Sequence, residues 1–267
     1  MTDLLLAGWL LYVGIIPFST YTINDTTRQY TNSVIEHVRL DFYATEYAHI
    51  YTTIEVRETK AYEVYFDPYR ADFRIGGELR YKNFAMGFWH ECNHDIVTNI
   101  LLNPYNGWDA AFADLYLSWQ KPLEVTPSVT LTPLLFAAYQ PYNSILLKFQ
   151  DGEKYLGNIH GPPSNPNDPY FNRYEDYVVM NHNLIARIGL EAELFGFLYT
   201  SLAFQPELSA AYMEWACFNL DFSLELRRRG IALGLSFNNR FDAGVNTGYA
   251  AHELRLYAAF RGKAVLF

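Results

Sequence analysis

Apolar and polar residues alternate along much of this chain, and the clearest stretch runs from Ala216 to Arg227. Successive side chains of a β-strand point to opposite faces, so this pattern predicts strands with one apolar and one mostly polar face. No helical periodicity of any length is present. The apolar set is Ala216, Phe218, Leu220, Phe222, Leu224 and Leu226, and the opposing set is Cys217, Asn219, Asp221, Ser223, Glu225 and Arg227.

The length of these alternating segments favours a membrane barrel over a soluble sandwich, which also alternates. Most reach the roughly 9–11 residues that a tilted transmembrane strand needs, whereas strands in globular sheets usually have about 5–6. A further strand at Gly8 to Ile16 would bring the number of strands to about twelve, and bacterial outer-membrane barrels have an even number of strands. The predicted strands are residues 37–46, 49–57, 70–82, 84–94, 109–120, 127–139, 178–193, 197–205, 214–228, 231–239 and 250–262.

The connections between these strands are alternately short and long. Short turns on one side and long loops on the other are the outer-membrane arrangement, and the chain ends in an aromatic residue, Phe267, as such barrels often do. We therefore expect residues 1–267 to form a single domain, an all-β antiparallel transmembrane β-barrel in the bacterial outer membrane. Short connections are expected at 47–48, 82–83, 121–122, 195–196 and 229–230, and long ones at 58–69, 95–108, 140–177, 206–213 and 240–249.

The beginning of the chain has two interpretations. Leu4 to Phe18 is a continuous apolar run of 15 residues, too short for a comfortable transmembrane helix. Residues 1–18 are either a secretory signal or part of a first strand. The acidic Asp3 and the lack of Lys or Arg ahead of the run favour the strand.

Composition agrees with a membrane barrel. Aromatic residues make up 17% of the chain and charged residues 18%, where a soluble domain normally carries about 25% charged residues. The net charge of −9 argues against a nucleic-acid partner, because no basic stripe is available to neutralise phosphates. Two cysteines cannot form a disulfide framework, and Cys92 and Cys217 are expected on opposite faces of their strands.

The predicted strand 84–94 carries candidate chemistry on its apolar face. His90, Cys92 and His94 continue the face that begins with apolar side chains, while Glu91 belongs to the opposite, lumenal face. In the next strand, parity places Asp109 on the apolar face as well. His90, Cys92 and Asp109 could therefore meet on the outside of the barrel near its long-loop end. Such a trio suits acyl transfer, with a histidine base, a thiol nucleophile and a carboxylate that orients the imidazole.

The stretch M-G-F-W-H-E-C-N at 86–93 resembles the active-site strand of outer-membrane phospholipase A, which has the form Gly-aromatic-x-His-x-Ser-Asn. By this resemblance His90 is the base, Cys92 takes the nucleophile position, and Asp109 in G-W-D-A-A-F-A-D-L-Y is the orienting residue. The family implies a twelve-stranded homodimer that needs calcium and hydrolyses lipid at the outer leaflet, with phospholipid or lipopolysaccharide as membrane partner. The motif covers residues 84–116, and this chain has Cys for Ser and His94 where Gly is usual.

Three other interpretations stay open. The row His90, Cys92 and His94 could be a polar rim at the membrane interface, or could hold a soft metal such as zinc. The whole protein could be a non-enzymatic barrel with a structural, adhesive or pore-forming role. Lumenal charges on residues 70–82 are expected to pair across strands, which would leave a narrow lumen poorly suited to a pore: Arg70, Arg74, Glu78 and Arg80.

Overall fold

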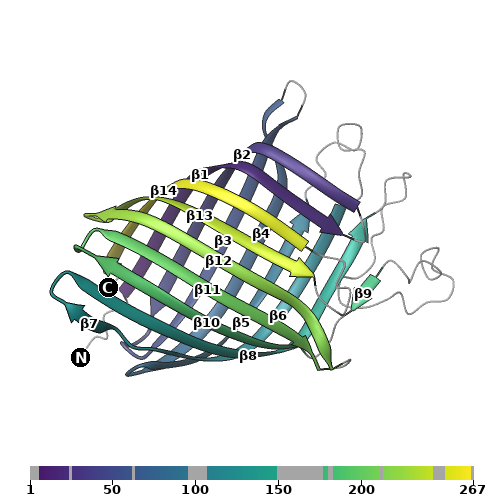
Figure 1. The fold of residues 1–267 in the computed structure, drawn as a ribbon. Helices are drawn as coiled ribbons and strands as arrows, with labels where there is room; N and C mark the ends of the chain where they lie inside the picture. Colours follow the sequence, from purple (N-terminus) through teal and green to yellow (C-terminus); the bar gives the residue numbers. More distant parts are fainter. Residues whose placement is uncertain are drawn as a thin grey trace.

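The computed structural model describes residues 6–23, 26–61, 64–95, 107–148, 177–179, 183–210, 213–242 and 250–265. This part of the chain is built from β-strands (Figure 1). It contains no helix that could span a membrane. The strands are β1 (Leu6–Ile23), β2 (Thr26–Tyr43), β3 (Ala48–Ala61), β4 (Val64–Tyr81), β5 (Phe84–Asp95), β6 (Gly107–Gln120), β7 (Leu123–Thr126), β8 (Val129–Lys148), β9 (Tyr177–Val179), β10 (Asn183–Leu194), β11 (Leu198–Ser209), β12 (Glu214–Arg228), β13 (Ile231–Asp242) and β14 (Ala250–Val265).

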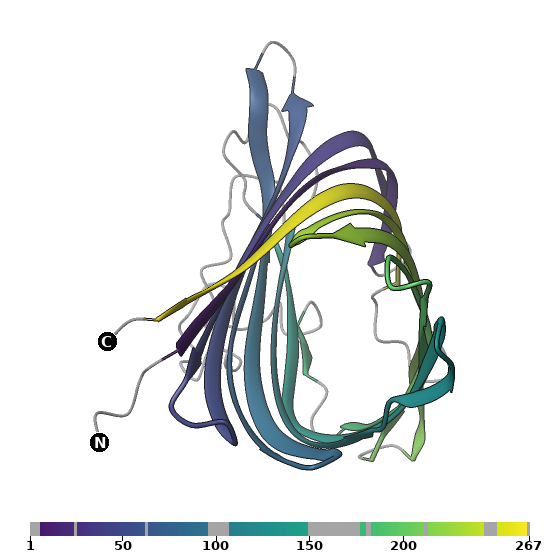
Figure 2. The ribbon, with the colours of Figure 1, turned by 90° about the vertical axis from the view of Figure 1, so that its left-hand side faces the viewer.

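Twelve of these strands form a closed antiparallel barrel, β1 to β6 followed by β8 and β10 to β14 (Figure 2). The ring closes on one side where β1 pairs with β14, and on the other where β10 pairs with β8. Closure leaves no free sheet edge, so the backbone amides and carbonyls of the wall can pair with neighbouring strands on both sides. The two remaining strands, β7 and β9, pair with opposite ends of β8.

The ring strands lie where strands were predicted, but some differ in extent. β8 runs on to Lys148, into the predicted long connection 140–177, and the single predicted strand 178–193 is replaced by β9 and β10. β1 takes up residues 6–23, so the apolar run near the start is a strand. β2 begins at Thr26 and β4 at Val64, earlier than the alternation predicted, because β1–β2 and β3–β4 continue as long hairpins. The prediction of a plain short turn at 121–122 was wrong, since the small strand β7 follows it and folds back on β8.

The short turns at 195–196 and 229–230 were predictable from their residue types. Phe195 and Gly196 have φ values of 57° and 70°, and Arg229 and Gly230 have values of 49° and 81°. Positive φ at both central residues is the signature of the type I′ turn, whose twist matches that of the flanking strands. Glycine at the second position adopts this conformation without a steric penalty. These turns fix the register of β10–β11 and β12–β13.

The outer wall of the barrel is apolar. The predicted lipid-facing residues Phe84, Met86, Phe88, Leu115 and Leu117 are each between 52% and 58% exposed. Leu220 and Phe222 are also exposed, while Phe218 is half-buried between Phe204 and Trp215. An exposed surface of this kind is unfavourable in water, so it requires a lipid environment.

Exposed aromatic residues flank the short turns at one end of this wall. Tyr81 and Phe84 border the turn at 82–83, and Phe195 and Phe197 lie at the turn between β10 and β11. Trp215 and Phe241 are exposed at the opposite ends of their strands. Aromatic girdles on both sides of an apolar band mark the two interfaces of an outer-membrane barrel. The protein is accordingly an integral β-barrel of the bacterial outer membrane.

Candidate functional site

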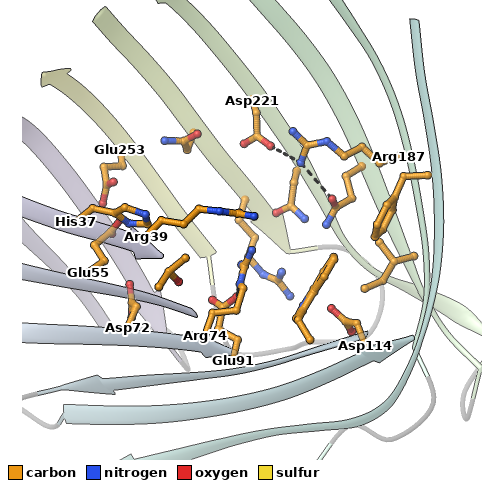
Figure 3. Close-up of a pocket in the computed structure, with 18 of the residues that line it drawn as sticks. His37, Arg39, Glu55, Asp72, Arg74, Glu91, Asp114, Arg187, Asp221 and Glu253 are labelled. Atoms are coloured by element: carbon orange, nitrogen blue, oxygen red, sulfur yellow. Dashed lines mark hydrogen bonds and ion pairs between the residues drawn. The ribbon is translucent and has the colours of Figure 1, made fainter. Parts of the chain in front are cut away.

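The lumen of the barrel contains a cavity of about 780 Å³ (Figure 3). Its lining side chains come from strands all around the ring and are mostly polar or charged. Alternation places them there, because the residues between the lipid-facing positions must point inward. Six arginines and seven carboxylates line the cavity: Arg39, Arg57, Arg74, Arg187, Arg240 and Arg255, with Glu55, Asp72, Glu91, Asp114, Glu207, Asp221 and Glu253.

One wall of the cavity, which runs from β14 across β1 and β2 to β3, holds an ion-pair network. Arg57 donates from Nη1 to Glu253 Oε2 at 2.8 Å and from Nη2 to Glu55 Oε1 at 2.7 Å. Arg255 donates to Glu55 at 3.1 Å and also pairs with Glu253. His37 Nδ1 lies 3.3 Å from the same Glu55 carboxylate. Each buried charge therefore faces opposite charges on two or more sides, which offsets the cost of removing it from water.

The wall formed by β4, β5 and β8 combines charge with aromatic rings. Arg74 pairs with Glu91 on the next strand, and its guanidinium lies 5.2 Å from the Trp89 ring centroid. Trp89 in turn stacks against Phe136 with a centroid distance of 5.6 Å, and both pack around Tyr116. This aromatic group is the most apolar part of the lumen.

Hydrogen-bonded polar side chains complete the lining on β6, β8 and β10 to β13. Gln140 donates to Asp114 at 2.8 Å and accepts from Asn183. Arg187 pairs with Asp221 at 2.9 Å. Farther along, Glu207 accepts hydrogen bonds from three side chains: Gln205 on its own strand, Asn219 on β12 and Arg240 on β13.

The prediction that lumenal charges pair across strands is confirmed for Arg74 and wrong for Arg80, which pairs with Glu78 on its own strand. The Arg70 side chain lies outside the described residues. Tyr116 donates to the same Glu78 at 2.5 Å from β6. Pairing does not fill the lumen, however, because a cavity remains between the paired side chains. The cavity does not test the prediction that such a lumen is poorly suited to a pore, and this stays a prediction.

On the outer wall, the structure brings together two of the three residues selected from the sequence. The sulfur of Cys92 lies 3.0 Å from Nε2 of His90, on the lipid-facing side of β5. Their neighbours across the strand pairs are apolar: Ile75 and Phe73 on β4, and Ala113 and Ala111 on β6. The imidazole and thiol are thus in hydrogen-bond contact near the long-loop end of the strand.

Asp109 lies farther along the neighbouring strand β6. The strand register places Asp109 opposite His94, while Ala113 is opposite His90. Four residues along a strand correspond to about 13 Å. The side chains of Asp109 and His94 are outside the described residues, so the orienting role of Asp109 stays a prediction, as does catalysis by His90 and Cys92.

The described residues do not offer a metal site near His90 and Cys92. Calcium prefers six to eight oxygen ligands, and the neighbouring outward side chains on β4 and β6 are apolar. Within the described ranges, no group of three or more His, Cys, Asp and Glu side chains is arranged to hold a metal ion. The zinc interpretation depends on His94, whose side chain is not described.

Sequence reasoning missed a second polar pair on the outer wall. His252 Nδ1 lies 3.0 Å from Asn239 Oδ1, and these residues are opposite each other on β14 and β13. Asn239 is only 5% exposed, and the ring of Phe241 packs on His252. By parity both residues continue the lipid-facing positions of their strands, so an isolated polar residue at the end of an apolar face was the available signal.

No family model matches the chain, and a search of curated proteins found no match to its sequence. Solved outer-membrane barrels align over nearly the whole chain. The KdgM porin in complex with disordered oligogalacturonate has a TM-score of 0.45 and 7% identity, covering 94% of this chain and 98% of the porin. The β domain of the Bordetella autotransporter BrkA has a TM-score of 0.49 and 10% identity, with 96% and 98% covered. Salmonella typhi OmpF in complex with daunomycin has a TM-score of 0.41 and 6% identity, with 95% and 97% covered. No functional argument rests on similarities of this size.

Proposed function

We propose that this barrel is a narrow channel for small polar solutes across the outer membrane. The observation that supports it is the lumenal cavity of about 780 Å³. Cavities of about 300–1,000 Å³ accommodate small organic molecules. The sequence left a structural, an adhesive and a pore-forming role open, and we therefore choose the pore.

The strand number supports the same choice. A barrel of about eight strands is just filled by its own side chains, whereas about sixteen leave a wide aqueous channel. Twelve strands lie between these limits, and the polar lining favours water and polar solutes over lipid. A purely structural barrel would gain nothing from keeping a charged cavity, since charges are stabilised by partners and not by empty space.

The experiment is conductance across planar bilayers, together with the swelling of liposomes in sugars of graded size. The test variant is Asn238→Trp, which places a large ring on the lumenal face next to Asp221 and Glu253. The matched control is Phe237→Trp, one residue away and 42% exposed to lipid. We expect Asn238→Trp to reduce conductance and Phe237→Trp to leave it unchanged. Absence of conductance in the folded wild-type protein would reject the channel.

A second candidate function, acyl-ester hydrolysis, is favoured by the 3.0 Å contact between Cys92 Sγ and His90 Nε2. In this reaction His90 takes the thiol proton and the thiolate attacks the lipid ester carbonyl. The lysolipid alcohol leaves with the proton from His90, and water then hydrolyses the thioester to release the fatty acid. The substrate would reach the pair from the outer leaflet, since both residues face lipid.

The test uses the full chain in detergent or lipid with a fluorescent phospholipid, with and without added calcium. We expect Cys92→Ala and His90→Ala each to abolish turnover, and Asp109→Ala to cost less. Cys217→Ala is the matched control, because that thiol is fully buried on the other face. Lack of turnover at every calcium concentration, in protein that conducts ions, would leave the channel as the function. Calcium dependence and the homodimer remain predictions of the resemblance.

A further inference from the structure

We infer that the lumen prefers small anions, although the chain as a whole carries a net charge of −9. This inference rests on the proposed channel. The observation behind it is that, in most of the lumenal ion pairs, the arginine side chain is more exposed than its carboxylate partner. Arg57 is the exception, at 7% exposed against 12% for Glu55 and 16% for Asp72.

Three pairs that line the cavity show this difference in exposure. The Arg39 side chain is 33% exposed against 13% for Asp41, its partner at the edge of the cavity. Arg74 is 38% exposed against 20% for Glu91. For Arg187 and Asp221 the values are 31% and 27%. Figure 3 shows Arg39 and Arg74 reaching from different walls into the middle of the cavity.

The same asymmetry continues toward the short-turn end of the lumen. Arg80 is 50% exposed against 10% for Glu78. Glu225 is likewise 10% exposed, while its partners Arg227 and Arg261 are 35% and 44% exposed. Water in this part of the lumen therefore meets guanidinium groups in preference to their partners.

Side-chain length and donor number explain the difference. Arginine is longer than aspartate or glutamate and carries five N–H donors, of which one ion pair uses two or three. The carboxylates are occupied from several sides, as Glu225 is by Tyr257, Arg227 and Arg261. Donors left over on the exposed guanidinium groups remain available to an anion in the lumen.

Two features oppose this preference and make it testable. The cavity lining has one more carboxylate than arginine, so charge counting alone gives a weak preference for cations. In addition, Glu191 is exposed on the lumenal positions of β10, two residues from Glu193. Side-chain exposure and the charge count of the lining thus predict opposite signs of ion selectivity.

The experiment is the reversal potential across a planar bilayer in a potassium chloride gradient. The key variant neutralises both members of the three exposed pairs, so that the net charge is unchanged: Arg39→Gln with Asp41→Asn, Arg74→Gln with Glu91→Gln, and Arg187→Gln with Asp221→Asn. The matched control neutralises the buried pair Arg240→Gln with Glu207→Gln, whose side chains are 15% and 5% exposed. A shift between heated and unheated protein on a denaturing gel verifies that each variant forms the barrel.

For the wild-type protein and the buried-pair control, we expect the sign of the reversal potential that results when chloride is more permeant than potassium. For the exposed-pair variant we expect the potential to move toward zero or to change sign. If the wild type conducts with the sign that potassium sets, the inference is overturned and the channel stands. Anion preference that survives in the exposed-pair variant also overturns it, because the guanidinium groups are then not its source. If no folded protein conducts, the proposed channel itself fails.

Should the combined variant not form a barrel, the single pair Arg74→Gln with Glu91→Gln decides the matter. Arg74 is the most exposed arginine of the three pairs, at 38% against 33% for Arg39 and 31% for Arg187. The reversal potential of this variant should move in the same direction by a smaller amount. The complementary variant Glu191→Gln removes an exposed carboxylate and should increase the preference for chloride. A change in the opposite direction in either variant rejects the inference.

Discussion

The two faces of β5 are made from alternate residues of one strand, yet the chemistry on them differs. On the lumenal face, Glu91 pairs with Arg74, which also lies against Trp89. On the outer face, His90 and Cys92 contact each other between apolar neighbours on both sides. Charged groups are ordinary in the lumen, where water and partners are at hand. A polar pair is exceptional on the outer wall.

This difference decides what a polar residue means in such a barrel. In the lumen almost every charged side chain has a partner, so the informative observation is which member of each ion pair is more exposed to water. On the wall, information lies in the presence of any polar pair, because lipid offers no compensating hydrogen bonds. The lumenal ion pairs therefore bear on the ion selectivity of the proposed channel, whereas the polar pair on the outer wall bears on chemical reactivity.

The largest expected effect comes from placing a charge on the wrong face. Leu115 is 56% exposed on the outer wall, and Leu115→Arg should destabilise the barrel by about 2–4 kcal/mol if it lies near mid-membrane. Ser118→Arg, on the lumenal face of the same strand, should cost roughly 0.5 kcal/mol or less. Reversible denaturation in lipid or detergent measures both. Equal costs for the two variants would mean that the faces do not differ in the way proposed.

A somewhat smaller effect is expected where the lumenal face is most tightly packed. A Cβ at Gly87 would lie 2.3 Å from the Gly77 carbonyl oxygen and 2.7 Å from the Tyr116 hydroxyl. Gly87→Ala should therefore destabilise the barrel by about 1–3 kcal/mol through overpacking. Gly189→Ala is the control, because its added Cβ would make ordinary contacts at 3.4 Å or more. A stable Gly87→Ala variant would show that β4 and β5 can separate at this point.

The strand positions and faces were predictable because lipid and lumen impose period-2 alternation for as long as a strand is inside the membrane. Beyond the membrane that constraint ends, which explains the missed residues at the start of β2. The sequence T-T-R-Q-Y-T-N from Thr26 has no apolar face, yet it continues the hairpin with β1 through backbone pairing.

Contacts between distant strands were not predictable from the sequence. Arg57 on β3 pairs with Glu253 on β14, 196 residues away, because the curvature of the closed ring brings the two lumenal side chains together across β1 and β2. The two-residue spacing of His90 and Cys92 predicted that both lie on one face of the strand, and the 3.0 Å contact between them agrees with this geometry. The offset of Asp109 depends on the pairing register of β5 and β6, which parity does not supply.

The smallest energetic effect, and the most direct comparison of the two faces, concerns the two cysteines. Neither is in a disulfide; Cys92 is half-buried on the outer wall, and Cys217 is 0% exposed. A lipid-soluble maleimide should modify Cys92 and spare Cys217, with no change in barrel stability. Peptide mass spectrometry locates the label, and Cys92→Ser should abolish it while Cys217→Ser should not. Because the thiolate is the reactive species, His90→Ala should slow labelling of Cys92 if the imidazole takes the thiol proton. An unchanged labelling rate in His90→Ala would reduce the pair to an interfacial contact, and labelling of Cys217 at an equal rate would contradict the assignment of the faces.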